Sequence, residues 1–108
     1  MNIQIPRAGW PIVVDQISQD NQNRPIKVEL LSSDLGVEPL ADDIPFRALD
    51  FDPQQEGKIL LSVGSGDGLT THVVGAPESL WLERTEDGTA VAFEIVAEEE
   101  KIIVSFLD

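Results

Sequence analysis

The sequence predicts a mostly-β α+β domain in which a short N-terminal helix packs on a curled antiparallel meander of about six or seven strands. Three observations predict this fold. One stretch near the N-terminus repeats its apolar residues with the helical period, and beyond residue 25 apolar residues alternate with polar ones. Glycine, proline and acidic residues separate the alternating runs, as in hairpin turns. A flat sheet would expose long edges, so we expect the sheet to curl, with a small barrel as the closed form.

Length and composition indicate one folded domain over residues 1–108. The chain has 108 residues and a mass of 11.8 kDa, which is the size of a single domain. Hydrophobic residues make up 42% of it, more than a disordered acidic tail would carry, so we expect a packed core. The absence of cysteine excludes disulfides, thiolate metal sites and cysteine nucleophiles.

The helix is expected over residues 11–19. Pro11 suits the first helical position, where its missing N–H leaves no bond unmade. The polar residues 20–23 end the pattern. A helix of this length is marginal alone, so it must pack on the sheet. Its apolar face is formed by Trp10, Val13, Val14 and Ile17.

The first strands follow Pro25. Residues 26–31 alternate like a half-buried strand, and residues 33–36 form a plausible turn. Residues 37–52 contain Pro39 and Pro45. Proline cannot donate to a strand ladder, so we expect this stretch to be an edge strand or a broken, bent one.

The second half of the chain reads as a series of hairpins. Glycine-rich or acidic turns at residues 64–68, 86–88 and 98–100 connect its alternating runs. In the run after the glycine-rich turn, we take Leu69, Thr71 and Val73 as the alternating set. The expected strands are residues 59–63, 69–74, 80–84, 91–95 and 102–106.

The charge of the chain limits its partners. Asp and Glu number 20 against 7 Lys and Arg, a formal net charge of −13, and the basic residues are scattered singly. Nucleic acid and anionic membrane surfaces are therefore disfavoured, and an RNA-binding small barrel is the least favoured use of the fold. No signal-peptide pattern opens the chain, and no run nears the roughly 20 apolar residues of a membrane span. We expect a cytoplasmic protein of a bacterial-type cell.

His72 is the one histidine and the obvious candidate for a general base or a metal ligand. Its position in the alternation places it opposite Leu69, Thr71 and Val73, so we expect a surface or rim residue. A catalytic triad with Ser62 or Ser65 and Asp67 can be written, but no nucleophile-elbow motif supports it.

Two further motifs are weak candidates for ligand sites. The loop at residues 64–68 has the glycine content of a phosphate loop but lacks its lysine, which favours a hairpin. Residues 50–56 resemble the opening of a calcium loop, but the glycine and glutamate of an EF-hand are missing from it. Weak, nonspecific cation binding remains open at Asp42 with Asp43, at Asp50 with Asp52, and at residues 98–100.

The two tryptophans are the best candidates for recognition. Trp10 begins the helix and is expected to anchor it in the core. Trp81 stands on the opposite face of its strand from Leu80 and Leu82. If both faces of that strand are apolar, the helix or a second subunit must cover the outer one.

The chain also contains short motifs that belong together. They are IPRAGWP at residues 5–11, followed by Asp15 and Ser18, then VELL at 28–31, DLG at 34–36 and AFEI at 92–95. These motifs resemble those of an uncharacterised bacterial family of small single-domain proteins, a domain of unknown function. The resemblance implies a self-contained domain and brings no catalytic or binding residue with it.

The sequence assigns no catalytic, cofactor-binding or metal residue and implies no cofactor. It favours a non-enzymatic acidic β-rich domain that acts through contact with a protein partner or through self-association. The alternative is a small-ligand or cation-binding module, with weak hydrolytic chemistry at His72 and nearby carboxylates as its remotest form.

Overall fold

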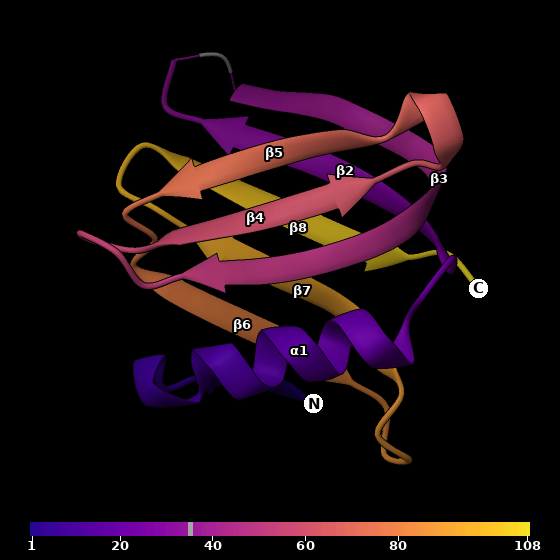
Figure 1. Cartoon of the computed structure of the whole chain (residues 1–108), viewed down its shortest axis with the longest axis horizontal. Coiled ribbons are helices and arrows are strands. Elements are labelled where there is room, and N and C mark those ends of the chain that lie inside the picture. The colour runs from indigo at the N-terminus through magenta and orange to yellow at the C-terminus, as the bar shows by residue number, and fades with distance from the viewer. Residues whose placement is uncertain (35) are drawn as a thin grey trace.

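The computed structural model describes residues 1–34 and 36–108 and confirms the mostly-β α+β fold (Figure 1). In this part of the chain one α-helix, α1 (Trp10–Asp20), accompanies a single sheet of eight strands. The strands are β1 (Asn2–Ile5), β2 (Pro25–Ser32), β3 (Gly36–Asp52), β4 (Lys58–Val63), β5 (Thr70–Gly75), β6 (Ser79–Arg84), β7 (Ala90–Val96) and β8 (Glu100–Phe106).

The sheet combines two meanders. β2 to β5 pair in sequence and β6 to β8 pair in sequence, while β8 pairs with β2 and joins the two sets. The strand order is β1-β6-β7-β8-β2-β3-β4-β5, and each pair of neighbouring strands in it is antiparallel. The sheet curls so that β4 and β5 lie in front of β8 and β2 (Figure 1). Its end strands β1 and β5 do not pair with each other, so the sheet is curled but not closed into a barrel.

The prediction of six or seven strands did not include β1. It pairs with β6, from Asn2 opposite Glu83 to Ile5 opposite Leu80. Residues 2–5, Asn-Ile-Gln-Ile, do alternate polar and apolar side chains, but four residues are the shortest run that indicates a strand. The partner of β1 lies far away in the sequence, so its place at the edge beside β6 could not be predicted from this short run.

β3 confirms the bent alternative of the prediction for residues 37–52 and contradicts the edge alternative, because it is one strand of 17 residues in the interior of the strand order. Its first half (Gly36–Pro45) pairs only with β2, and its second half (Phe46–Asp52) pairs only with β4. Three register shifts each place an extra residue on β3, which bends the strand from one layer to the other. The predicted turn over residues 33–36 includes residue 35, which lies outside the described residues.

α1 extends one residue beyond the predicted range at each end, and Pro11 lies in its first turn as expected. The helix covers the side of the second half of β3 that faces away from β4 (Figure 1). Trp10, only 1% exposed, anchors the helix as predicted, with its Nε1 donating to the Ile5 carbonyl over 2.9 Å. Its ring meets Phe51 edge-on at 5.5 Å between centroids.

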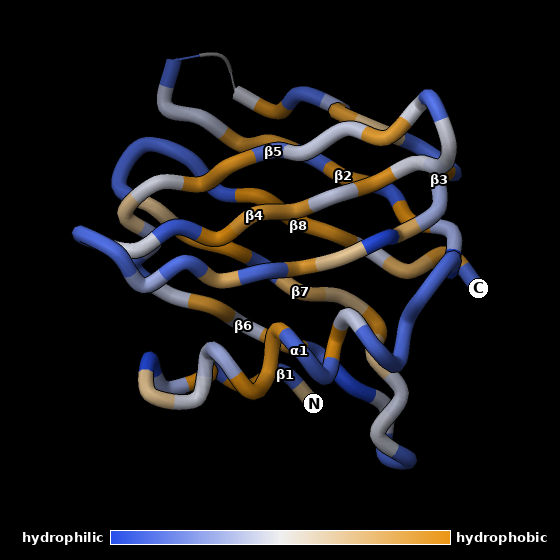
Figure 2. The backbone as a smooth tube through the Cα atoms, in the orientation of Figure 1, coloured by the Kyte–Doolittle hydropathy of each residue, from blue (hydrophilic) through white to orange (hydrophobic). Residues whose placement is uncertain are grey.

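The core lies between the layers of the curled sheet and under α1, where the apolar segments of the strands face one another (Figure 2). Phe46, Phe93 and Phe106 form an aromatic cluster in it, with ring centroids 5.8–6.1 Å apart. None of the helices in the described residues is long and apolar enough to cross a bilayer.

Candidate functional site

Each half of β3 has a strand partner on one side only. The two unpaired sides differ in whether another element covers them. The side of the second half is covered by α1 and the turn that follows it, where the side chains of Ser18 in the helix and Gln22 in the turn bond the backbone of Leu49 and Arg47. No strand of the described residues pairs with the corresponding side of the first half. β5 is the nearest strand across that gap (Figure 1). We call the gap between β5 and the first half of β3 the open seam.

A small apolar cavity of about 200 Å³ lies at the open seam. Four strands contribute to its wall, so the cavity reaches from the seam toward the core. The lining residues are Val28, Leu40, Ala41, Ile44, Leu61, Val63, Thr70 and His72. Thr70 and His72 are the polar members of this wall, and the remaining six are hydrophobic.

Large apolar side chains are exposed on both sides of the open seam. On β3 these are Val37, 60% exposed, and Leu40, 43% exposed. On the other side are Leu69, 53% exposed, and Val73, 48% exposed. Four exposed apolar residues beside a cavity form a patch of the kind that marks interaction sites.

The predicted alternation of β5 is also wrong, because the residues that face the core are not the predicted set of Leu69, Thr71 and Val73. Val74 is fully buried opposite Ile59, whereas Val73 and Leu69 are exposed. Val73 and Val74 are both apolar, so the sequence is compatible with either register. The pairing with β4 selects the register that buries Val74.

His72 lies on the edge strand β5, with its side chain 35% exposed. The predicted alternation placed it on the face away from the core, and this facing is wrong. His72 shares the inner face of β5 with Thr70 and Val74 and lines the cavity of the open seam. Its Nε2 is buried without a hydrogen-bond partner in the described residues and lies 3.9 Å from Glu100 Oε1 on β8.

The structure does not assemble the triad that can be written around His72. Ser62 points away from the cavity and its Oγ lies 3.0 Å from Thr71 Oγ1, whereas His72 faces the inner side. Ser65 and Asp67 belong to the loop that joins β4 to β5, as the hairpin prediction requires. Gly64 in that loop has a φ of +97°, which explains its glycine.

The acidic candidates for cation binding do not converge. Within residues 1–34 and 36–108, no group of three or more His, Asp or Glu side chains is arranged to hold a metal ion. Asp52 instead accepts the Gln54 N–H in the β3–β4 turn, and Glu100 lies beside His72. Asp42 and Asp43 are exposed on the bend of β3, where Asp43 has a φ of +55°.

Trp81 lies on the outer face of β6 and is half-buried, while Leu80 and Leu82 face the core. Its Nε1 donates to Ser79 Oγ over 3.2 Å. α1 packs on the inner side of the sheet, so the helix is not what covers Trp81. Part of the outer face is polar, because Glu94, opposite Trp81, pairs with Lys101 at 2.8 Å.

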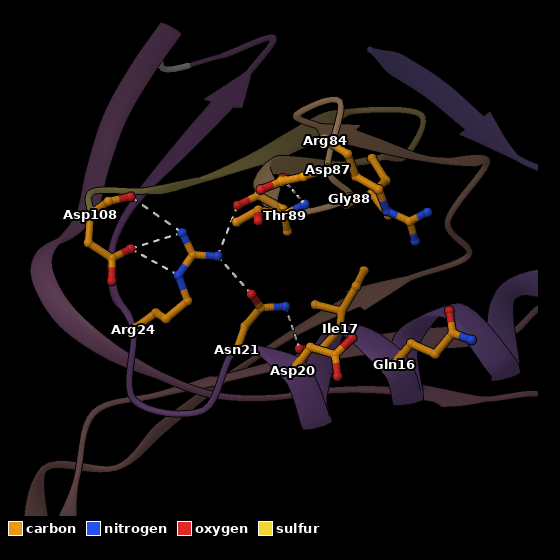
Figure 3. Close-up of a pocket in the computed structure, with 12 residues that line it drawn as sticks. Gln16, Ile17, Asp20, Asn21, Arg24, Arg84, Asp87, Gly88, Thr89 and Asp108 are labelled. Carbon is orange, nitrogen blue, oxygen red and sulfur yellow. Dashed lines mark hydrogen bonds and ion pairs between the residues drawn. The ribbon is translucent and has the colours of Figure 1, made fainter.

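A second groove, of about 550 Å³, opens between the C-terminal end of α1 and the β6–β7 turn (Figure 3). No pattern in the sequence indicated this groove. Arg24 at its floor is fully engaged within the protein. Its guanidinium donates to Asn21 Oδ1, the Ala90 carbonyl and Asp108, and it also lies 4.3 Å from the centre of the Phe106 ring. These bonds join the helix, β7 and the C-terminal residues, so Arg24 has a structural role.

The fold and the open seam define a single-domain, mostly-β protein whose curled sheet is not closed and leaves β5 unpaired beside the first half of β3. The chain belongs to the family described as "Family of unknown function (DUF5335)", whose model matches residues 1–108. No curated protein and no solved structure matches it.

Proposed function

We propose that the protein acts through contact with another protein and that the open seam is the surface of contact. The observation that carries the proposal is the unequal covering of β3. One unpaired side is covered by α1, and the other is left beside a cavity and four exposed apolar residues. Apolar surface in contact with water is unfavourable by roughly 25 cal/mol per Å², so covering this patch favours association.

The size of the cavity argues against a small-molecule ligand. At about 200 Å³ it is smaller than the roughly 300–1,000 Å³ of ligand pockets. Its wall holds one titratable side chain, His72, whose Nε2 has no hydrogen-bond partner in the described residues and so is not paired with the Thr70 hydroxyl. The open seam is therefore better suited to a protein surface than to an enclosed substrate.

Site-specific photo-crosslinking tests this proposal. A photoreactive amino acid is placed at Leu40 or Leu69, on the two sides of the open seam, and at Ile12 as a matched control. Ile12 is 65% exposed and apolar but lies on α1, away from the seam. We expect both seam positions to crosslink to one segment of one protein, identified by mass spectrometry, and Ile12 to give no such adduct. The same mixture of adducts from all three positions, or none from the seam, contradicts the proposal.

A further inference from the structure

We propose that the free edge of β5 accepts an extended, cationic and apolar segment of a partner protein as an additional strand. This inference rests on the proposed function and specifies the occupant of the open seam. An added strand obtains its affinity from main-chain hydrogen bonds to the exposed edge and its specificity from the side chains beside it.

β5 is the edge that is least protected against such pairing. Natural edge strands carry lysine, proline, inward-pointing charges or bulges, or they are very short. β5 (Thr70–Gly75) has six residues with no proline, no acidic residue and no Lys or Arg. The opposite edge, β1, has only four residues, and the first half of β3 contains Pro39 and Pro45. The open seam therefore presents one edge suited to pairing and one edge that resists it.

The surroundings of β5 indicate the side chains of the added strand. Successive residues of a strand point to opposite faces. One set would lie over the cavity beside Leu40 and His72, and the other set would lie on the outer side beside Leu69 and Val73. Apolar residues in both sets would cover the exposed apolar residues of the open seam.

The charge around the open seam favours a cationic partner. Residues 36–45 and 66–75 contain four carboxylates, those of Glu38, Asp42, Asp43 and Asp67, and no Lys or Arg. A groove of about 820 Å³ at the C-terminal end of β5 is lined in part by Glu78 and residues 98–100, and again by no basic residue.

Charge also separates a foreign partner from a second copy of this chain. A second copy brings a net charge of −13 to an already acidic surface and is repelled. A Lys- or Arg-bearing segment is attracted to the same surface, so the partner rather than the copy is the expected occupant.

Synthetic peptides test the inference without a known partner. The probes are a peptide of about eight residues in which two Val residues alternate with two Lys residues, so that both faces of the strand carry Val and Lys, its counterpart with Glu in place of Lys, and a Val–Lys peptide with N-methylated amides. We expect the Val–Lys peptide to bind at least about tenfold more tightly than either other peptide. Its binding should weaken with salt, and its addition should slow hydrogen exchange at amides of β5.

Matched variants localise the binding. Leu40→Lys should weaken binding of the Val–Lys peptide, whereas Ile12→Lys, an equal change at an exposed position outside the seam, should not. Asp42→Asn with Asp43→Asn should also weaken binding, and Asp15→Asn with Asp20→Asn serves as its control. Asparagine tolerates the positive φ of residue 43, so this variant should fold.

The outcomes separate this inference from the proposed function. Equal binding of the N-methylated peptide, equal weakening by Leu40→Lys and Ile12→Lys, or a dimer in light scattering at low salt overturns strand addition by a cationic partner. Specific crosslinks at Leu40 and Leu69 together with no peptide binding overturn the inference and leave the proposed function standing. Absence of both crosslinks and peptide binding overturns both.

Discussion

Arg7 shows how a single exposed side chain connects separate segments of this fold. Its guanidinium donates to the carbonyls of Glu56 and Pro77, over 2.8 and 3.3 Å. It also lies 4.7 Å from the centre of the Trp10 ring and 5.8 Å from that of Phe51. Arg7 and Trp10 both belong to the IPRAGWP motif at residues 5–11, so the role that this motif shows in the structure is to fix the entry of α1 onto β3.

Gly57→Ala should disturb this arrangement. Gly57 has a φ of +85°, and a Cβ there would lie 2.7 Å from Arg7 Nη2 and 3.1 Å from Phe51 Cε1. Backbone strain of about 1–2 kcal/mol and overpacking of about 1–3 kcal/mol should both lower the free energy of unfolding. Gly88→Ala is the control, because Gly88 has a φ of +91° with open space around it. Urea denaturation should show a larger loss for Gly57→Ala, and equal losses would contradict the steric account.

Asp87 should make a small contribution to stability that depends on pH. A hydrogen bond from the Thr85 hydroxyl, followed by bonds from Thr89, holds the pKa of the Asp87 carboxyl below its usual value. A lowered pKa stabilises the folded state above the pKa of the unfolded chain and loses this effect as pH falls through the folded pKa. The Tm difference between the protein and Asp87→Asn should therefore be present at neutral pH and shrink in acid. A difference that grows in acid would have the wrong sign.

At the scale of elements, Ser18 connects α1 to β3. Its Oγ accepts the Leu49 N–H over 2.8 Å, and the carbonyls of Val14 and Leu49 lie at the same distance as acceptors for its one proton. A half-buried hydroxyl thus provides the partner that a neighbouring strand would otherwise supply to this part of β3.

Ser18→Ala should weaken the packing of the helix on the sheet. It leaves the Leu49 N–H without its partner, which should lower the free energy of unfolding by about 1–3 kcal/mol. Gln19→Ala is the control, because Gln19 bonds only the exposed Asp15 on the same helix, and it should change stability by less than about 0.5 kcal/mol. Chemical denaturation of both variants makes the comparison. A similar small effect from both would show that the Ser18 bonds contribute nothing.

The features that the sequence predicted are those determined locally. The helix over residues 11–19 was predicted within one residue at each end, because its periodicity and Pro11 act within the segment itself. The prolines at 39 and 45 correctly indicated a strand segment with a free side. They wrongly suggested an edge position for the whole strand, because β3 pairs with different strands in its two halves.

The features that escaped prediction depend on distant parts of the chain. β1 needs β6, the facing of β5 is decided by its register with β4, and the open seam exists because β5 and the first half of β3 do not pair. Residues 2–5 do alternate like a strand, but none of these pairings is encoded in a local period. His72 was expected on the face of β5 away from the core, but it lies on the inner face, and its position in a cavity and beside Glu100 could not be read from one strand.

At the scale of the whole molecule, the formal net charge is −13, and few carboxylates of the described residues have a close cationic partner. Among the described residues the close pairs are Arg24 with Asp108 at 2.9 Å and Lys101 with Glu94 at 2.8 Å. Most carboxylates therefore repel one another on the folded surface, and the compact state concentrates that repulsion.

Salt should consequently stabilise the protein. Raising NaCl from about 10 mM to about 200 mM shortens the screening length from roughly 30 Å to below 10 Å, which reduces long-range repulsion more than it weakens two close pairs. Each gain of about 1 kcal/mol should raise the Tm by about 4–8 °C in a domain of this size. A Tm that falls with salt contradicts this account. MgCl2 at equal ionic strength is the control. An equal rise in Tm with MgCl2 means general screening. A much larger rise in Tm at low millimolar Mg²⁺ would show that some carboxylates bind cations specifically, which overturns screening as the explanation.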